Sequence, residues 1–424
     1  MKKNLEVNIH HLTRVEGHGN INIRIRGGRV EQALWEVVES PRFFEPILVG
    51  KSWENAPVIT SRICGICSIG HTLASIRAIE QAFGYQPPKQ TRQLRLLLKH
   101  METLQSHILH IFFLAAPDFL DCNSILPLSS TRPEVVDLAT RLKKLANDGA
   151  DLIGGRRLHP TRAVAGGFTM LPTKEAVETL LRRLELALRD LMTAADIVAS
   201  FSFPDFQRET EYVSLQGEYD YPFIGGSLIS SDGMRKKEEQ YLEMTNEYQV
   251  RQSTSRWSRL SRASFAVGAL ARLNNNGRFL HPLAGKLAKR LNLLPTCSNP
   301  FLNTAAQLVE CIHVVEDSRI IIDRLLGQPW QTPRVQIEAR EARGVGAVEV
   351  PRGILYHMYA FDAHGRITKA DCVIPTSQNH GNIQLDLEQL AADSARAGLA
   401  DKVIEKLASM LIRAYDPCIS CSVH

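Results

Sequence analysis

The 424-residue chain lacks the features of a membrane or secreted protein. It has no apolar run of about 18 residues, the length of a membrane-spanning helix. Its apolar stretch "ILHIFFLAAPDFL" is broken by Pro117 and Asp118. The amino-terminal residues "MKKNLEVNIHHLTR" have neither the apolar core nor the cleavage site of a signal peptide. We therefore expect a cytoplasmic protein with no membrane span.

A strong charge of one sign and a nucleotide-binding motif are missing as well. The net charge is only +5, and basic residues alternate with acidic ones, as in "KKEEQ". This pattern is typical of solvated helix faces and excludes a basic stripe for nucleic acid. No Gly-x-Gly-x-x-Gly follows an expected strand, so any nucleotide chemistry would belong to another subunit.

Hydrophobic periodicity is the main evidence for the fold. Residues 5–38 alternate between apolar and polar, as strands of a hairpin do, and residues 345–375 form strands around a turn at His364 and Gly365. Helical patterns cover residues 72–83, 91–116, 131–148, 173–201, 299–326 and 399–414. We expect Ser130 or Thr131 to cap the third of these.

These patterns predict a mainly α fold with an α+β periphery, in which β-hairpins and small sheets surround a long central helix bundle. A single domain is expected over residues 1–424. It would comprise a β-rich part (about 1–60), a helical core and a metal-binding carboxy-terminal tail.

Cysteine is present in eight copies, and four of them form two Cys-x-x-Cys pairs. Cys64 and Cys67 lie in "RICGICSIGH", where Gly65 favours a tight bend, and Cys418 and Cys421 lie in "DPCISCSVH". Two such pairs offer four soft ligands for zinc, an iron–sulfur cluster or another thiophilic metal. The remaining four are expected to be inert core thiols: Cys122, Cys297, Cys311 and Cys372.

The distance between the pairs discriminates among these metal sites. Cys67 and Cys418 are 351 positions apart, whereas structural zinc sites close much shorter spacings. A site that joins both ends of a large chain must be assembled by the whole fold. The spacing thus favours a functional metal centre, with structural zinc and unrelated thiols as the alternatives.

Both cysteine motifs match one family. "RICGICSIGH" resembles the Arg-x-Cys-Gly-x-Cys-x-x-x-His signature of nickel–iron hydrogenase large subunits, and "DPCISCSVH" resembles their carboxy terminus. Further blocks follow in the family's order: "RVEGHG", "RFFEPILVGK", "HILHIFFLAAPDF", "GGRRLHPTRAVAGG", "VEVPRGILYH" and "CVIPTSQN". The one departure is "RFFE" in place of the commoner Arg-Gly-Phe-Glu, and it keeps the Glu.

The resemblance implies a Ni–Fe centre that cleaves dihydrogen heterolytically and reversibly. All four thiolates would bind nickel, with Cys64 and Cys418 as terminal ligands. Cys67 and Cys421 would bridge to an iron that carries CO and two cyanide ligands. Soft, deprotonated thiolates suit such metals.

The resemblance also implies roles for side chains around the metals. Glu16 would relay the proton released at Cys418, although a plain ion pair with Arg14 is the alternative. Arg352, which follows Pro351, would stand over the open metal position, unless it forms only a structural ion pair. Asp118 and Asp416 would hold its guanidinium.

Three more residues would surround the iron ligands. His71 would donate a hydrogen bond to a bridging thiolate such as Cys421, and such bonds tune a metal. Pro375 would shape the wall of the pocket for the cyanides, and Thr376 would supply hydrogen-bond donors to it. The alternative is that this stretch is an ordinary strand and turn.

A second metal is implied at the carboxy terminus. Glu45, the backbone carbonyl of Cys372 and the ring of His424 match the family's magnesium site, which holds iron in some members. Magnesium prefers oxygen ligands, so a His ligand leaves the identity of this metal open.

The implied partners follow from what the chain lacks. It has no further cysteine cluster for an electron relay, so an iron–sulfur small subunit is expected. The compact chain resembles the cytoplasmic, soluble branch (nicotinamide-nucleotide-coupled and sulfhydrogenase-like), which implies further subunits that bind nicotinamide nucleotide or flavin. The alternatives are a structural zinc protein or scaffold, and a regulatory hydrogen sensor.

Overall fold

Helices dominate the computed structural model, which describes residues 4–330 and 333–424. The helices are α1 (Phe44–Leu48), α2 (Ala56–Thr60), α3 (Ser68–Phe83), α4 (Lys89–Ile108), α5 (Ala116–Phe119), α6 (Leu128–Thr131), α7 (Pro133–Gly154), α8 (Lys174–Ala199), α9 (Leu242–Thr245), α10 (Ala269–Asn276), α11 (Pro282–Arg290), α12 (Asn303–Leu326), α13 (Pro375–Arg396), α14 (Asp401–Ala414) and α15 (Ile419–Ser422). A π-helical segment, Leu109–Ala115, continues α4. Short 3-10 turns cover Trp53–Asn55, Ser61–Ile63, Glu238–Gln240, Gly277–Phe279 and Pro300–Leu302.

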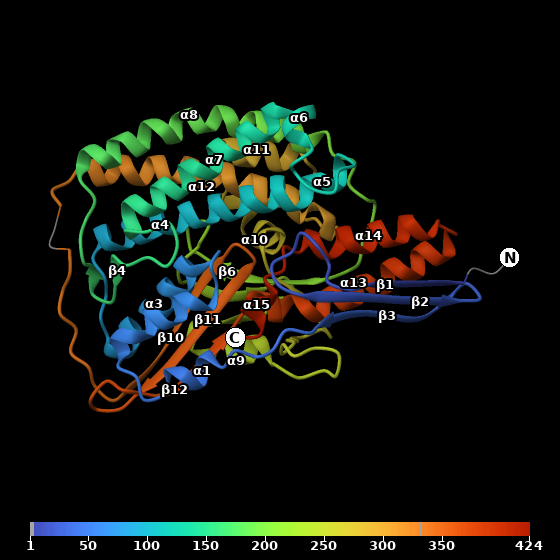
Figure 1. Cartoon of the computed structure of the whole chain (residues 1–424). Helices are drawn as coiled ribbons and strands as arrows, with labels where there is room; N and C mark the ends of the chain where they lie inside the picture. The colour runs from blue at the N-terminus through green and yellow to red at the C-terminus, as the bar shows by residue number, and fades with distance from the viewer. Residues whose placement is uncertain (1–3, 331–332) are drawn as a thin grey trace.

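The long helices α4, α7, α8 and α12 pack around one shared core, with α8 above α7 and α12 and α4 below them (Figure 1). α4 contacts α7 and α12, and α8 contacts the same two helices. Their facing apolar residues, such as Leu98, Met101 and Leu184, are fully buried in the largest core cluster. Among the described helices, none is both long and apolar enough to cross a membrane.

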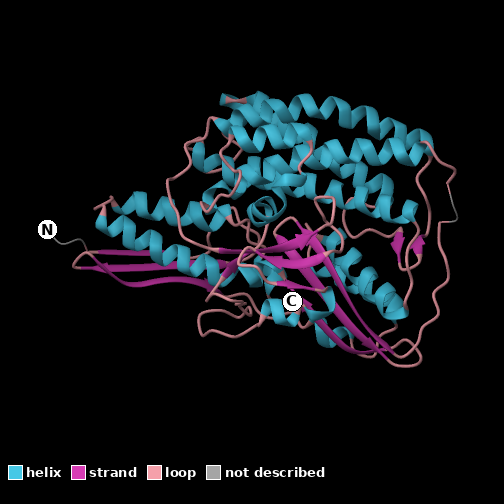
Figure 2. Cartoon of the chain, turned by 180° about the vertical axis from the view of Figure 1, so that it is seen from behind, coloured by secondary structure: helices cyan, strands magenta, loops and turns pink. Residues whose placement is uncertain are grey.

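The strands form small sheets beside these four helices (Figure 2). The strands are β1 (Leu5–Ile9), β2 (Gly19–Arg26), β3 (Arg29–Val37), β4 (Ala163–Val164), β5 (Gly167–Phe168), β6 (Glu211–Gln216), β7 (Ser227–Ser230), β8 (Arg235–Lys236), β9 (Phe265–Ala266), β10 (Ala342–Val350), β11 (Gly353–Phe361) and β12 (Ile367–Val373). β1–β2–β3 is an antiparallel sheet that packs on α13, and β10–β11–β12 is a second one that packs on α3.

The sequence-based expectations hold for the overall class: the chain is mainly helical with small sheets. Two boundaries were wrong. The β-rich part ends at Val37 rather than near residue 60, because α1 begins at Phe44. Arg132 occupies the N-cap position of α7 without a capping bond from its side chain, since Thr131 already belongs to the short helix α6.

The carboxy-terminal tail lies deep in the molecule, beside the first part of the chain (Figure 1). The backbone N–H of Ile419 donates to the carbonyl of Glu16 at 2.9 Å, and that of Arg42 donates to the carbonyl of Val423 at 2.8 Å. These bonds fix the last residues against the amino-terminal segment. The tail is therefore a structural element rather than a frayed end.

Candidate metal centre

Four thiols from the two ends of the chain meet in one buried cluster. Cys64 and Cys67 lie just before α3, and Cys418 and Cys421 lie at and within α15. The four sulfur atoms are all within 4.8 Å of one another. The Sγ–Sγ distances are 3.5 Å for Cys64–Cys418, 3.7 Å for Cys67–Cys421 and 2.7 Å for Cys418–Cys421. Gly65 does not supply the expected special bend: its φ is not left-handed, and a Cβ there would meet nothing within 4 Å.

This cluster has the chemistry of a metal site. Thiolate–metal bonds are about 2.3 Å long, so sulfurs on opposite sides of one ion lie about 4.6 Å apart. The observed spread of 4.8 Å matches that span. Hydrogen bonds from the other thiols, Cys418 first, hold the pKa of Cys64 well below its usual range. Burial raises the pKa of Cys418 and Cys421, so the dry pocket needs a cation before all four can ionise.

Glu16 contacts this cluster directly. Its Oε2 lies 3.1 Å from the Cys418 sulfur, which donates to it, and accepts the backbone N–H of Ser420 at 3.1 Å. The Ser420 hydroxyl donates to the other carboxylate oxygen. Arg14 pairs with Asp118 instead. The carboxylate of Glu16 is thus placed to exchange a proton with the thiol.

Arg352 is buried next to the thiols and is held by Asp416, the first residue of the carboxy-terminal motif. Its Nε donates to the carbonyl of Asp416 at 2.6 Å, and its Nη2 pairs with Asp416 Oδ1 at 2.8 Å. Burial alone would lower the pKa of Arg352, but the charge of Asp416, together with negative charge on the nearby cysteines, raises the pKa well above its usual value. Gln307 donates to the second oxygen of Asp416 at 3.1 Å. The guanidinium is therefore permanently charged and fixed in place.

Asp118 does not hold Arg352, so that prediction was wrong. Its carboxylate pairs with Arg413 at 2.7 Å and with Arg14 at 2.5 Å. Arg14 also donates to the carbonyl of Leu114 at 2.6 Å. Asp118, in α5, thus ties the amino-terminal segment to α14.

His71 is fixed by a chain of buried polar groups. Its Nδ1 lies 3.1 Å from Nε2 of His357, whose Nδ1 lies 2.7 Å from the hydroxyl of Tyr359. Burial lowers the pKa of His71 to about 4 and that of His357 as well, so both rings are neutral at pH 7. The hydrogen bonds of the described residues do not include the expected one from His71 to Cys421.

Pro375 and Thr376 begin α13 rather than a strand and turn. The Thr376 hydroxyl accepts the backbone N–H of Cys418 at 3.0 Å, which places it against the thiol cluster. Pro351 sits at the turn between β10 and β11, immediately before Arg352. Thr376 thus contacts the cluster through Cys418, while Pro375 and Pro351 adjoin Thr376 and Arg352 in the chain.

The residues expected at a second metal also come together. Glu45 Oε1 accepts the backbone N–H of Cys372 at 2.9 Å and lies 3.6 Å from Nε2 of His424. His424 Nδ1 donates to the carbonyl of Cys421 at 3.1 Å. Burial raises the pKa of Glu45, but the hydrogen bond and charge of His424, the N–H of Cys372 and the charge of Arg256 together outweigh burial, and the net shift is downward. Arg256 pairs with the other oxygen of Glu45 at 3.5 Å.

Three contacting residues were missed from the sequence. Ser420 binds Glu16, Gln307 binds Asp416, and Arg42 donates to the carbonyls of Ile63 and Ser420. Ser420 and Arg42 lie inside the quoted motifs, so their positions alone could have drawn attention to them. Gln307 lies on α12 in an unmarked stretch, and only the fold reveals it.

A family model described as nickel-dependent hydrogenase matches residues 42–148 and 267–424. The chain belongs to the nickel-dependent hydrogenase family. A second model, described as HoxL-like, matches residues 6–40. The chain is the catalytic large subunit of a nickel–iron hydrogenase, an oxidoreductase that acts on dihydrogen.

Similar hydrogenase chains align along their whole length. Sulfhydrogenase 1 subunit alpha of Pyrococcus furiosus is 32% identical over 99% of this chain and 98% of its own. NAD-reducing hydrogenase HoxS subunit beta of Cupriavidus necator is 26% identical over 97% and 93%. These relatives confirm the predicted resemblance to the sulfhydrogenase and nicotinamide-nucleotide-coupled branch. They disfavour the alternative of a zinc protein.

Solved hydrogenase structures share the fold. The crystal structure of an NAD+-reducing [NiFe]-hydrogenase in the H2-reduced state covers 99% of both chains with a TM-score of 0.88 and 26% identity. The Ni-Fe-Se hydrogenase from D. vulgaris Hildenborough covers 100% of both with a TM-score of 0.78; at 23% identity it supports the fold alone. The family match supports a Ni–Fe centre in this hydrogenase, and the structure offers the thiol cluster as the candidate site.

Proposed function

We propose that this hydrogenase cleaves dihydrogen reversibly at a Ni–Fe centre held by Cys64, Cys67, Cys418 and Cys421. One observation carries the proposal: these thiols come from opposite ends of the chain, yet their sulfurs lie within 4.8 Å of one another. Cys67 and Cys421 would also hold the iron, which would carry CO and two cyanides. When bound, the metals supply the electron-rich site at which the H–H bond is polarised.

The chain's own side chains would manage the proton. The Cys418 sulfur takes it first, and Glu16 receives it over the 3.1 Å contact. The bonds from Ser420 orient the carboxylate toward the sulfur. The charge of Arg352, fixed by Asp416, stabilises negative charge at the reacting position, and burial keeps water away.

Ligands and a second metal complete the proposed site. Arg352 would donate to one cyanide, and Thr376 and the backbone after Pro375 would donate to the other. Glu45, the carbonyl of Cys372 and His424 would hold magnesium or iron, and this metal would anchor the tail.

The protein context is part of the proposal. The whole chain acts as one domain, because the thiol site needs both of its ends. Electrons leave to an iron–sulfur small subunit, since the thiol cluster is the one group of cysteines among the described residues that lie close enough together to hold a metal. Further subunits that bind nicotinamide nucleotide or flavin accept them, and the complex works in the cytoplasm.

Elemental analysis with infrared spectroscopy tests the proposal on the purified complex. We expect nickel in this chain in equal amount to the iron of its centre, with absorption bands from bound CO and cyanide. Zinc in place of nickel, with no such bands, would refute it.

A further inference from the structure

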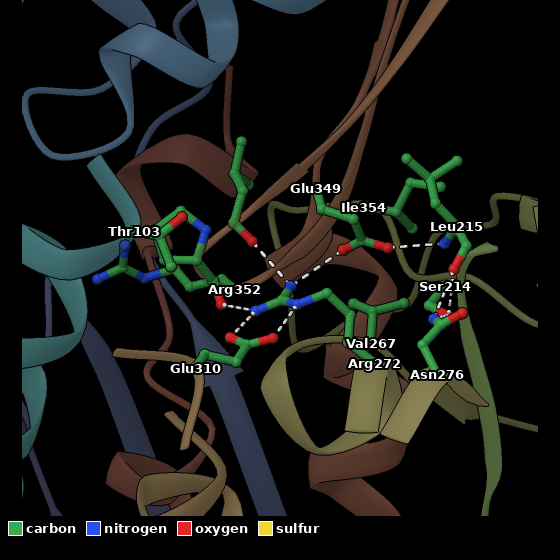
Figure 3. A network of polar contacts seen from close by, with 12 residues as sticks. Thr103, Ser214, Leu215, Val267, Arg272, Asn276, Glu310, Glu349, Arg352 and Ile354 are labelled. Atoms are coloured by element: carbon green, nitrogen blue, oxygen red, sulfur yellow. Dashed lines mark hydrogen bonds and ion pairs between the residues drawn. The ribbon is translucent and has the colours of Figure 1, made fainter. Parts of the chain in front are cut away.

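A second arginine, Arg272 on α10, donates hydrogen bonds to the two backbone carbonyls just before Arg352. Its guanidinium is 1% exposed, and all five N–H groups are used (Figure 3). Nε and Nη2 each donate to Glu310 at 2.6 Å, and Nη1 donates to Glu349 at 3.0 Å. The two remaining N–H groups donate to backbone carbonyls, that of Val350 at 3.0 Å and that of Pro351 at 3.1 Å.

The carboxylates around Arg272 are themselves anchored on other elements. Glu310 on α12 also accepts from the hydroxyl of Tyr221 at 2.6 Å and pairs with His107 of α4 at 2.8 Å. Glu349 also accepts the backbone N–H of Leu215 in β6 at 2.7 Å. Arg272 is thus fixed by residues of α4 and α12 and by the sheet that contains β6. A guanidinium held at every N–H cannot shift without breaking a buried bond.

The carbonyls of Val350 and Pro351, which accept these bonds, lie at the turn that carries Arg352. β10 ends at Val350, Pro351 and Arg352 form the turn, and β11 begins at Gly353. Asn379 donates to the carbonyl of Arg352 at 3.5 Å, and Asp416 holds its side chain. Arg272 therefore fixes the backbone that precedes Arg352, and Asp416 fixes the guanidinium of Arg352 itself.

We propose that Arg272 is a positioning residue, which holds the turn at Val350 and Pro351 so that the Arg352 guanidinium stands at the thiol cluster. This inference rests on the role proposed above for Arg352. Lysine offers three donors instead of five and no planar fork, so Arg272→Lys loosens the turn but keeps the buried charge. A misplacement of about 1 Å at a reacting centre can cost about 100-fold in rate.

The test is a double-mutant cycle on the purified complex, scored as hydrogen-dependent dye reduction per bound nickel. Arg272→Lys should lower turnover by about 10- to 100-fold with nickel and iron retained. On an Arg352→Lys background the same substitution should add less than about a twofold loss, because its effect passes through Arg352. The cyanide infrared bands should shift in the same direction in both single variants.

A matched control separates positioning from general destabilisation. Arg95 is another buried arginine on a bidentate carboxylate, with two 2.7 Å bonds to Glu80, and it does not contact the turn. Arg95→Lys should leave turnover per nickel unchanged. An equal loss in Arg95→Lys would overturn the inference.

The remaining outcomes are distinguishable. If the losses from Arg272→Lys and Arg352→Lys multiply, Arg272 acts independently and the inference fails while the role of Arg352 stands. If Arg352→Lys alone keeps full turnover, the role proposed for Arg352 fails instead. If the Arg272→Lys variant fails to bind nickel, Glu349→Gln takes its place in the double-mutant cycle. This substitution weakens the bond between Arg272 and Glu349, and the same outcomes support or overturn the inference.

Discussion

Replacing Glu16 by Gln isolates the proton step of the proposed mechanism. Gln has the size of Glu and keeps one oxygen for the Ser420 N–H, but it can neither accept nor release a proton at neutral pH. A positioned acid–base group contributes about 10²–10⁴-fold in rate, or about 2.7–5.5 kcal/mol of barrier. Turnover and deuterium–proton exchange should both fall by that factor.

The folded protein should tolerate this change. Glu16 is half-buried, and Gln loses about one hydrogen bond of roughly 1 kcal/mol. Nickel and iron contents should therefore match those of the unmodified complex. Both rates are measured on the purified complex, one by hydrogen-dependent dye reduction and the other by mass spectrometry of exchanged gas.

Glu39 offers a matched control for Glu16. It is a neighbouring carboxylate that accepts the backbone N–H of His18 at 3.0 Å and makes no contact with the thiols. Glu39→Gln should leave both rates unchanged. If Glu16→Gln with full metal content exchanged protons as fast as the unmodified complex, the relay through Glu16 would be disproved.

Three further outcomes are expected. Cys67→Ser should abolish nickel binding and activity together, because a hard hydroxyl replaces a soft ligand; normal nickel content would contradict the ligand set. Tyr359→Phe removes the hydroxyl that orders the neutral His357–His71 pair, so the CO and cyanide bands should shift and activity should fall about tenfold with metals retained; an unchanged spectrum would argue against this chain of contacts. Burial lowers the pKa of His100 to about 4 from 6.5, so the unfolded chain binds more protons between these values and stability falls as pH drops through them; His100→Asn should reduce that fall in thermal unfolding, and an identical slope would refute the assignment.

Local patterns were enough to predict much of the molecule. Alternation over residues 5–38 and helical periodicity over residues 173–201 each reflect one buried face, which a strand or helix needs wherever it packs. The helix α13 was missed because its first half is buried on all sides, and its polar residues, such as Asn379 and His380, leave no apolar stripe to detect.

The site divides in the same way between sequence and tertiary structure. The four thiols and their pairing could be predicted from local sequence, because two residues between cysteines place both sulfurs at one turn whatever the rest of the chain does. Three contacts depend on how distant segments pack: the meeting of the two pairs, the bond of Asp118 to Arg413 rather than Arg352, and the bond of Arg272 to the turn at Pro351. Such contacts join residues far apart in the chain, and a charged side chain takes whichever buried partner the packing brings within reach.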